Sequence, residues 1–87
     1  MNFGQALECL KNGDPITRTG WSGANLFVYL VPAAAYPAQT GVAKSYWGTN
    51  LVPYEAYFAI KNSRGTVNTW VPSVSDCLAD DWLLVRT

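Results

Sequence analysis

Trp70-Val71-Pro72-Ser73-Val74-Ser75-Asp76-Cys77-Leu78-Ala79-Asp80-Asp81-Trp82 is the stretch of sequence that decides how this chain folds. A strand is expected to end at Trp70, because Pro72 lacks the N–H group that a sheet ladder needs. Trp82 opens a last apolar run, which predicts a strand over residues 82–86. The segment between these two strands therefore determines how the C-terminal half is arranged.

A short helix is predicted inside this stretch, over residues 73–80. Ser73 and Asp76 stand three residues apart, which is the spacing of a capping box, with Asp in place of the usual Glu or Gln. Hydroxyl groups, a carboxylate and the nearby indole of Trp70 gather at this helix N-terminus. We therefore expect this end of the helix to hold a polar, ring-bearing ligand.

The N-terminal segment predicts another helix, over residues 3–12. Asn2 and Gln5 repeat the capping-box spacing, and apolar residues recur at helical spacing after them. Gly13 suits the left-handed position just beyond a helix end, and Pro15 prevents the helix from continuing.

Two strands and a long loop are predicted to follow. Residues 16–18 form a short strand, and residues 19–23 form a turn cluster that carries a tryptophan. Residues 26–31 are apolar without interruption, which predicts a strand buried on both faces. Residues 33–50 show no clear period and are interrupted by Pro37 and by two glycines, so we expect a loop there.

A β-hairpin is predicted next. Residues 54–61 form a strand whose even-numbered side chains, from Tyr54 to Ile60, share one face. Residues 62–65 have the composition of a hairpin turn, in which a glycine supplies the positive φ, and residues 66–70 return as the partner strand. Together the elements predict an α+β fold: a small antiparallel sheet with an N-terminal helix and a short C-terminal helix before the last strand.

Length and composition indicate a single domain, residues 1–87, that associates with further copies of itself. Aromatic residues make up 14% of the chain, and charged residues also make up 14%, against about 25% in typical domains. A chain this small buries a limited core, so many aromatic and few charged side chains favour a homo-oligomer. The alternative is an aromatic-rich core in a monomer.

Charge and hydropathy exclude several kinds of partner. Six basic and six acidic side chains balance, and no basic stripe is present, so we expect no DNA or RNA partner. No apolar run approaches the ~20 residues that span a bilayer, and the first residues do not resemble a signal peptide. We therefore expect no membrane partner and a cytoplasmic location. Cys9 and Cys77 form no CxxC pair and are expected to be buried free thiols.

The residue types argue against an enzyme. The sequence contains no histidine, which removes Ser/His/Asp and Cys/His sites and metal sites built on histidine. Asp76 is explained as a helix cap, and Asp80 and Asp81 as a solvated helix end, so no acid–base pair stands out. The glycine motifs that cradle phosphates are absent. We therefore expect a binding protein that needs no metal and no cofactor.

Eight side chains are candidates for ligand binding. Trp21 lies in a glycine-flanked turn, where its indole can stack on a base, and Arg18 offers a forked donor for phosphate. The alternative for each tryptophan is a place in the core. The full candidate set is Arg18, Trp21, Asn25, Phe27, Trp70, Ser73, Ser75 and Asp76.

Both ends of the chain resemble one protein family. The matching residues at the start are Asn2-Phe3-Gly4-Gln5-Ala6-Leu7, Leu10-Lys11-Asn12-Gly13 and Arg18-x-Gly20-Trp21. Those at the end are Trp70-x-Pro72-Ser73-x-x-Asp76-x-Leu78-Ala79-x-Asp81-Trp82. On these motifs the chain is similar to the second type of Thoeris anti-defence protein, which phages encode.

The resemblance implies a sponge that acts in the host bacterial cytosol. Such proteins bind cyclic ADP-ribose isomers (glycocyclic ADP-ribose) made by bacterial TIR enzymes and hold them without cleaving them. The resemblance also implies cyclic dinucleotides as further ligands, and a homotetramer with pockets between subunits. In such a pocket Trp21 would stack on the adenine, Arg18 would meet the pyrophosphate, and Asp76 would accept from a ribose hydroxyl. The alternative is a structural or protein-interaction accessory protein of a phage, with no nucleotide ligand.

Overall fold

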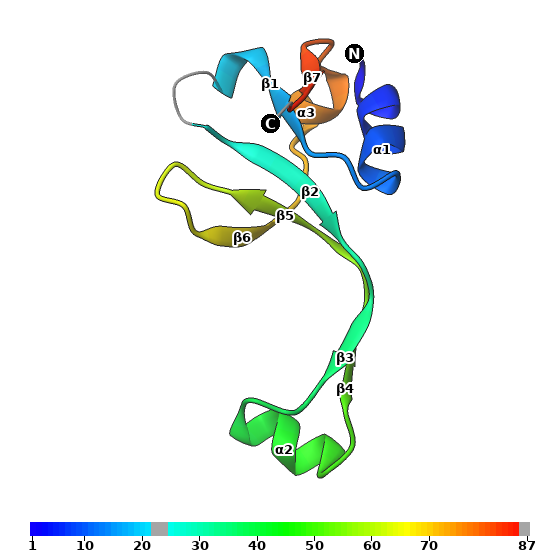
Figure 1. Cartoon of the computed structure of the whole chain (residues 1–87), viewed down its shortest axis with the longest axis vertical. Helices are drawn as coiled ribbons and strands as arrows, with labels where there is room; N and C mark the ends of the chain where they lie inside the picture. Colours follow the sequence, from blue (N-terminus) through cyan, green and yellow to red (C-terminus); the bar gives the residue numbers. More distant parts are fainter. Residues whose placement is uncertain (22–24, 86–87) are drawn as a thin grey trace.

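A computed structural model describes residues 1–21 and 25–85, and these residues form the predicted α+β fold. The main body is a five-stranded antiparallel sheet with the strand order β6-β5-β2-β1-β7 (Figure 1). Its strands are β1 (Ile16–Arg18), β2 (Phe27–Val31), β5 (Tyr57–Lys61), β6 (Val67–Trp70) and β7 (Trp82–Leu84). The other elements are α1 (Phe3–Lys11), the 3₁₀ helix η1 (Thr19–Trp21), β3 (Ala34–Tyr36), α2 (Gly41–Trp47), β4 (Val52–Tyr54) and α3 (Val74–Leu78).

The N-terminal helix α1 begins at the predicted capping box and ends just before the predicted glycine. The Asn2 side chain accepts a hydrogen bond from the Gln5 amide at 2.9 Å, and the Gln5 side chain accepts from the Asn2 amide at 3.0 Å. Gly13 follows the helix with a φ of 90°, in the left-handed region that glycine adopts without steric cost. The predicted helix over residues 3–12 is thus confirmed to within one residue.

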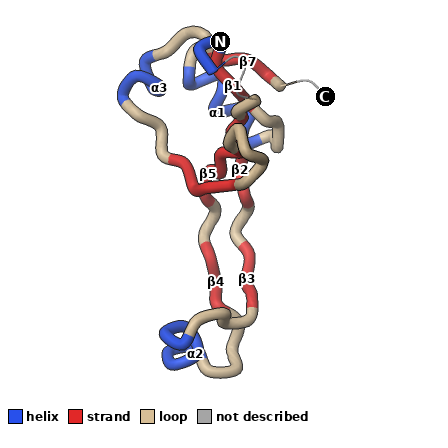
Figure 2. The backbone as a smooth tube through the Cα atoms, turned by 90° about the vertical axis from the view of Figure 1, so that its left-hand side faces the viewer, coloured by secondary structure: helices blue, strands red, loops and turns tan. Residues whose placement is uncertain are grey.

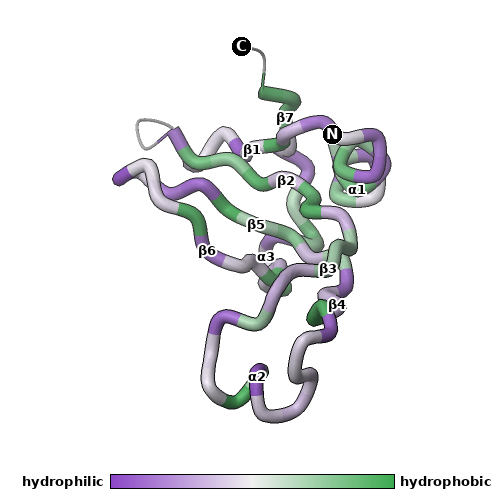
Figure 3. The backbone as a smooth tube through the Cα atoms, turned by 60° about the horizontal axis from the view of Figure 1, so that its bottom comes forward, coloured by the Kyte–Doolittle hydropathy of each residue, from purple (hydrophilic) through white to green (hydrophobic). Residues whose placement is uncertain are grey.

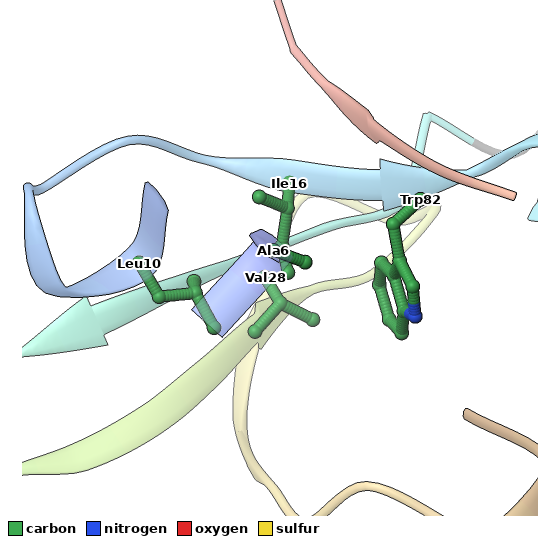
Figure 4. Close-up of a cluster of buried hydrophobic side chains, with 5 residues drawn as sticks. All are labelled: Ala6, Leu10, Ile16, Val28 and Trp82. Carbon is green, nitrogen blue, oxygen red and sulfur yellow. The ribbon is translucent and has the colours of Figure 1, made fainter. Parts of the chain in front are cut away.

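The core lies between α1 and one face of the large sheet. Five side chains form it, and all of them are completely shielded from solvent: Ala6, Leu10, Ile16, Val28 and Trp82 (Figure 4). The indole N–H of Trp82 donates to the backbone carbonyl of Asp76 at 2.9 Å, so the polar atom of this buried ring is satisfied. This bond also ties β7 to α3, and α3 therefore lies on the same side of the sheet as α1.

The opposite face of the sheet, which we call the open face, is covered by none of the described helices. Strand register assigns side chains to it, because residues directly opposite one another point the same way and neighbours in one strand alternate. Phe27 pairs with Lys61 and Lys61 with Val67, while Thr17 pairs with Leu83. Two tyrosines of β2 and β5, Tyr29 and Tyr57, share this face.

The prediction that residues 26–31 are buried on both faces is therefore wrong. Val28 is completely buried under α1, whereas the other residues of β2 are only half-buried. Figure 3 shows that β2 is hydrophobic along most of its length. The continuous apolar run thus reflects a sheet with one face packed and one face apolar but uncovered.

The predicted loop over residues 33–50 is also wrong, because it contains a strand and a helix. Strands β3 and β4 pair antiparallel and carry α2 at their far end, forming an arm over residues 32–56 that extends away from the main sheet (Figures 1 and 2). Thr40 caps α2 by accepting from the Ala43 amide at 3.1 Å, and Gly48 ends it with a φ of 62°.

The arm makes the molecule elongated. The described chain extends over 45 × 26 × 26 Å with a radius of gyration of 15.6 Å. A compact domain of this length has a radius of gyration of about 12 Å. A lone two-stranded ribbon is only marginally stable in water. Contact with another surface would therefore stabilise this arm.

Several element boundaries differ from the prediction. The predicted strand over residues 54–61 is divided: Tyr54 belongs to β4, and β5 begins only at Tyr57. Tyr54 and Ala56 are exposed and do not continue the face of Phe58 and Ile60. The hairpin turn is as predicted, with a φ of 84° at Gly65.

The C-terminal elements are shorter than expected. Helix α3 runs only over Val74–Leu78, with Ser73 as its N-cap, and β7 ends at Leu84. The predicted turn over residues 19–23 begins as η1, and its remaining two residues lie outside the described part of the chain. None of the helices described has the length and apolar character that a bilayer crossing demands.

Candidate functional site

Arg18 is the centre of a charged cluster that joins three elements. Its Nε donates to Asp81 Oδ1 and its Nη1 donates to Asp76 Oδ1, each at 2.9 Å. Thr19 adds a hydroxyl bond of 2.9 Å to the second oxygen of Asp81. The cluster therefore fixes the end of β1 to α3 and to the residue before β7.

This cluster shifts the pKa of all three charged groups. Hydrogen bonds from Arg18 and then Thr19 hold the pKa of Asp81 below its usual range. Desolvation alone would raise the pKa of Asp76, but hydrogen bonds from Ser73 and Arg18 outweigh it and lower that pKa. Hydrogen bonds to Asp81 and Asp76 raise the pKa of Arg18. All three groups are thus charged at neutral pH, and their charges sum to −1.

This geometry overturns the expectation for Asp81 and restricts the one for Arg18. The solvated helix end expected for Asp81 is wrong, because its carboxylate is held by Arg18 and Thr19. The forked donor expected of Arg18 is already occupied, because two of its three nitrogens bond to protein carboxylates. Arg18 therefore holds elements of the protein together, and three of its five N–H donors remain for a ligand.

The candidate tryptophans Trp21 and Trp70 belong to a cluster of aromatic rings beside the core. The ring centroid of Trp21 lies 5.4 Å from that of Trp82 and 6.4 Å from that of Trp70, in edge-to-face arrangements. Trp70 lies 6.1 Å from Trp82 and 6.5 Å from Phe3. Both candidates are half-buried, so each combines packing against the core with an accessible part.

The N-terminus of α3 is a completed cap. Ser73 Oγ accepts from the Asp76 amide at 3.1 Å, and Asp76 Oδ2 accepts from the Ser73 amide at 2.9 Å. The other oxygen of Asp76 bonds to Arg18, so both carboxylate oxygens already have protein partners. Asp76 is thus the predicted cap, and the same bonds weaken its case as an acceptor for a ribose hydroxyl. Ser75 lies exposed on the first turn of α3.

A cleft of about 620 Å³ brings four of the eight candidates together: Arg18, Trp21, Asn25 and Phe27. Its size falls within the range of about 300–1,000 Å³ typical of small-molecule sites. The other four candidates, Trp70, Ser73, Ser75 and Asp76, do not line it. The described lining is completed by Thr17, Thr19, Leu26, Lys61, Leu83 and Val85.

Lys61 is the lining residue that the sequence reasoning missed. Its Nζ lies 5.8 Å from the ring centroid of Phe27 and donates to the backbone carbonyl of Asn25 at 3.1 Å. Asn25 presents that carbonyl from a left-handed conformation, with a φ of 52°, which asparagine tolerates better than most residues. The signal was the cross-strand pairing of Phe27 with Lys61, which depends on the register of β2 and β5.

No carboxylate or thiol is among the described residues that line the cleft. No cluster of three or more metal-ligating side chains occurs among them. Cys9 is half-buried with its sulfur 3.9 Å from that of Met1, whereas Cys77 is exposed, so the expectation of two buried thiols is wrong for Cys77. The cleft instead offers aromatic faces, amide groups and one lysine to a ligand.

The fold and the cleft define a class of small α+β proteins in which helices cover one face of an antiparallel sheet and an aromatic cleft lies beside its strands β1 and β2. Within that class, residues 1–85 match the family model described as the Thoeris anti-defense 2-like domain. The chain is also 38% identical over 85 residues to "Thoeris anti-defense 2" of Bacillus phage SP01, covering 98% of this chain and 94% of that protein. The chain therefore belongs to the Thoeris anti-defence 2 family, and its role is that of a phage protein that counters Thoeris defence.

Proposed function

We propose that this protein sequesters cyclic ADP-ribose isomers, glycocyclic ADP-ribose among them, and holds them without cleaving them. The observation that carries the proposal is the cleft lined by Trp21, Phe27 and Lys61, whose volume and lining suit a nucleotide. Trp21 and Phe27 offer ring surfaces for an adenine, and Asn25 and Lys61 offer donors to phosphate oxygens. Cyclic dinucleotides combine the same chemical groups and are proposed as a second ligand class.

Binding without cleavage fits the chemistry of the chain. The sequence contains no histidine, and the two aspartates nearest the cleft are engaged by Arg18. A carboxylate with a lowered pKa that already accepts hydrogen bonds is a weak general base. The ligand would therefore be withheld from the defence effector intact, which is how a sponge blocks signalling in the host cytosol.

Homotetramer assembly is part of the proposal, because two surfaces of the chain are aromatic or apolar and uncovered. On the arm, Tyr36, Tyr46 and Tyr54 are 52%, 80% and 48% exposed. On the open face, Tyr57 and Val67 are 43% and 51% exposed. Surfaces of this kind usually meet another protein surface, and a second copy seated on the open face would enclose the cleft.

A protein-interaction accessory protein without a nucleotide ligand is the second candidate. The exposed aromatic side chains of the arm favour it, because tyrosine and tryptophan are enriched at protein interfaces. Under this alternative the cleft would bind a side chain of a partner and show no preference for nucleotides.

Equilibrium dialysis separates the two candidates. The protein, at 9.5 kDa per chain, is dialysed against glycocyclic ADP-ribose, against a cyclic dinucleotide, and against AMP as a linear control. We expect saturable uptake of the cyclic ligands at a fixed ratio to the chain and much weaker uptake of AMP. Absence of uptake of every cyclic nucleotide at micromolar concentration would leave the protein-interaction role as the better account.

A further inference from the structure

A doubly charged phosphate ligand needs a positively charged group in the cleft. Arg18 lines the cleft, but it already donates hydrogen bonds to protein carboxylates. Arg18 donates to two carboxylates, and its cluster carries a net charge of −1. A pyrophosphate placed against this cluster would meet a group whose net charge is negative. The cluster therefore does not favour an anion.

Lys61 is the other basic side chain that lines the cleft, and its position differs in two ways. Its strand β5 is separated from β1 by β2, which is two strand spacings or about 10 Å. Lys61 also points to the open face, whereas Arg18 pairs with Asp76 of α3 on the covered face. An anion bound at Lys61 would thus lie on a different strand and a different face of the sheet from the ion pairs of the cluster.

The ammonium group of Lys61 is held in place without being neutralised. Phe27 lies directly opposite on β2, and its ring stands 5.8 Å from Nζ. The remaining contact of Nζ is the uncharged carbonyl of Asn25, at 3.1 Å. Within residues 1–21 and 25–85, no carboxylate lies within ion-pair distance of this ammonium, so its charge and two of its three protons are available.

The hydroxyl groups of the cleft do not compete for this role. Thr17 donates its hydroxyl hydrogen to the Leu26 carbonyl at 2.7 Å, and Thr19 donates to Asp81 at 2.9 Å. Each hydroxyl has one hydrogen, so both are acceptors toward a ligand and cannot donate to a phosphate without breaking these bonds.

On this geometry we propose that Lys61, supported by Phe27 and Asn25, is the residue that recognises the phosphate groups of the ligand, and that Arg18 is a positioning residue. This inference rests on the proposed function and assigns the charged end of its site. It places the pyrophosphate at the β5 side of the cleft and leaves the Trp21 side for the base.

Four variants test the assignment by titration with glycocyclic ADP-ribose at two salt concentrations, with a melting curve for each. Lys61→Met removes the charge and keeps an unbranched side chain over Phe27, and Lys61→Arg keeps the charge. Arg64→Met is the matched control, because Arg64 is an exposed cation in the adjoining turn. The fourth, Phe27→Leu, removes the aromatic face while keeping an apolar residue on β2.

We expect Lys61→Met to weaken binding at least tenfold, or about 1.4 kcal/mol, and to reduce the salt dependence of the affinity. Lys61→Arg should restore most of the affinity, Phe27→Leu should lose part of it, and Arg64→Met should bind like the parent. An unchanged affinity and salt dependence in a folded Lys61→Met protein would overturn the inference while leaving the proposed function intact. A parent protein that binds no cyclic nucleotide would overturn both.

Discussion

At the scale of single residues, Arg18 is a side chain whose hydrogen bonds stabilise the fold. Its two bonds of 2.9 Å link β1 to the capped end of α3 and to the start of β7. Arg18 belongs to the motif at the start of the chain, and Asp76 and Asp81 belong to the motif at its end. The ion pairs bring these two motifs into contact in the fold.

The first prediction concerns acid stability. The folded-state pKa values of Asp76 and Asp81 are lowered, so their contribution to the free energy of unfolding is complete above the unfolded pKa of about 3.9. It is lost as the pH falls through the folded-state values. We therefore expect the melting temperature to fall steeply below about pH 4. The variant Asp81→Asn should show a shallower fall than Asp80→Asn, its exposed neighbour, and equal profiles in the two variants would contradict the role of the cluster.

The second prediction concerns Trp21, which contacts the core and lines the cleft. Removing a buried aromatic side chain costs about 3–5 kcal/mol, and a half-buried ring should cost about 2 kcal/mol. We expect Trp21→Ala to stay folded with that loss of stability and to bind cyclic ADP-ribose isomers at least tenfold more weakly. Trp21→Phe should recover part of both quantities. A stability loss accompanied by unchanged affinity would show that Trp21 belongs to the core alone.

At the scale of secondary structure, the N-caps of α1 and α3 were the features that the sequence predicted best. Asn2 with Gln5, and Ser73 with Asp76, form the two capping boxes at the expected positions, because cap chemistry is local to four residues. The arm was missed for the opposite reason. Its strands have three residues each and its helix seven, and such short elements depend on their partners more than on local propensity.

The third prediction tests the cap of α3. Ser73→Ala removes the hydroxyl that accepts from the Asp76 amide and should lower the free energy of unfolding by about 1 kcal/mol. Ser75→Ala is the matched control, because Ser75 is exposed two residues further along, and its effect should stay within about 0.5 kcal/mol. Chemical denaturation of both variants provides the comparison. Equal stabilities would mean that the Ser73 bond does not support the helix.

At the scale of the whole molecule, the fold class was predicted from the sequence, but only four of the eight candidate site residues line the same cleft. Arg18, Trp21, Asn25 and Phe27 line one cleft, whereas the residues around α3 lie elsewhere. The four that line the cleft come from β1, η1 and the start of β2, whereas the other four come from the end of β6 and from α3, and the distance between these elements depends on strand pairing. Lys61 was missed for the same reason, since its proximity to Phe27 comes from a contact across 34 residues of chain.

The fourth prediction concerns assembly through the arm and the open face. Light scattering at micromolar concentration should show about four times the 9.5 kDa chain mass, as proposed for a closed homotetramer. The double variant Tyr36→Ser/Tyr54→Ser removes two exposed rings that lie 6.0 Å apart on the arm and should lower that mass. Tyr46→Ser, at the tip of the arm, tests whether α2 takes part. A parent protein that scatters as a clean monomer would contradict the assembly.

The recovery of ligand after heat denaturation tests the central claim most directly. The protein is incubated with glycocyclic ADP-ribose, separated from unbound nucleotide by ultrafiltration, and heated until it precipitates. Mass spectrometry then identifies and quantifies what is released. A sequestering protein should release the intact cyclic nucleotide in the amount that it had bound. A linear or hydrolysed product would instead show an enzyme, and an empty supernatant would show that the protein takes up no such ligand.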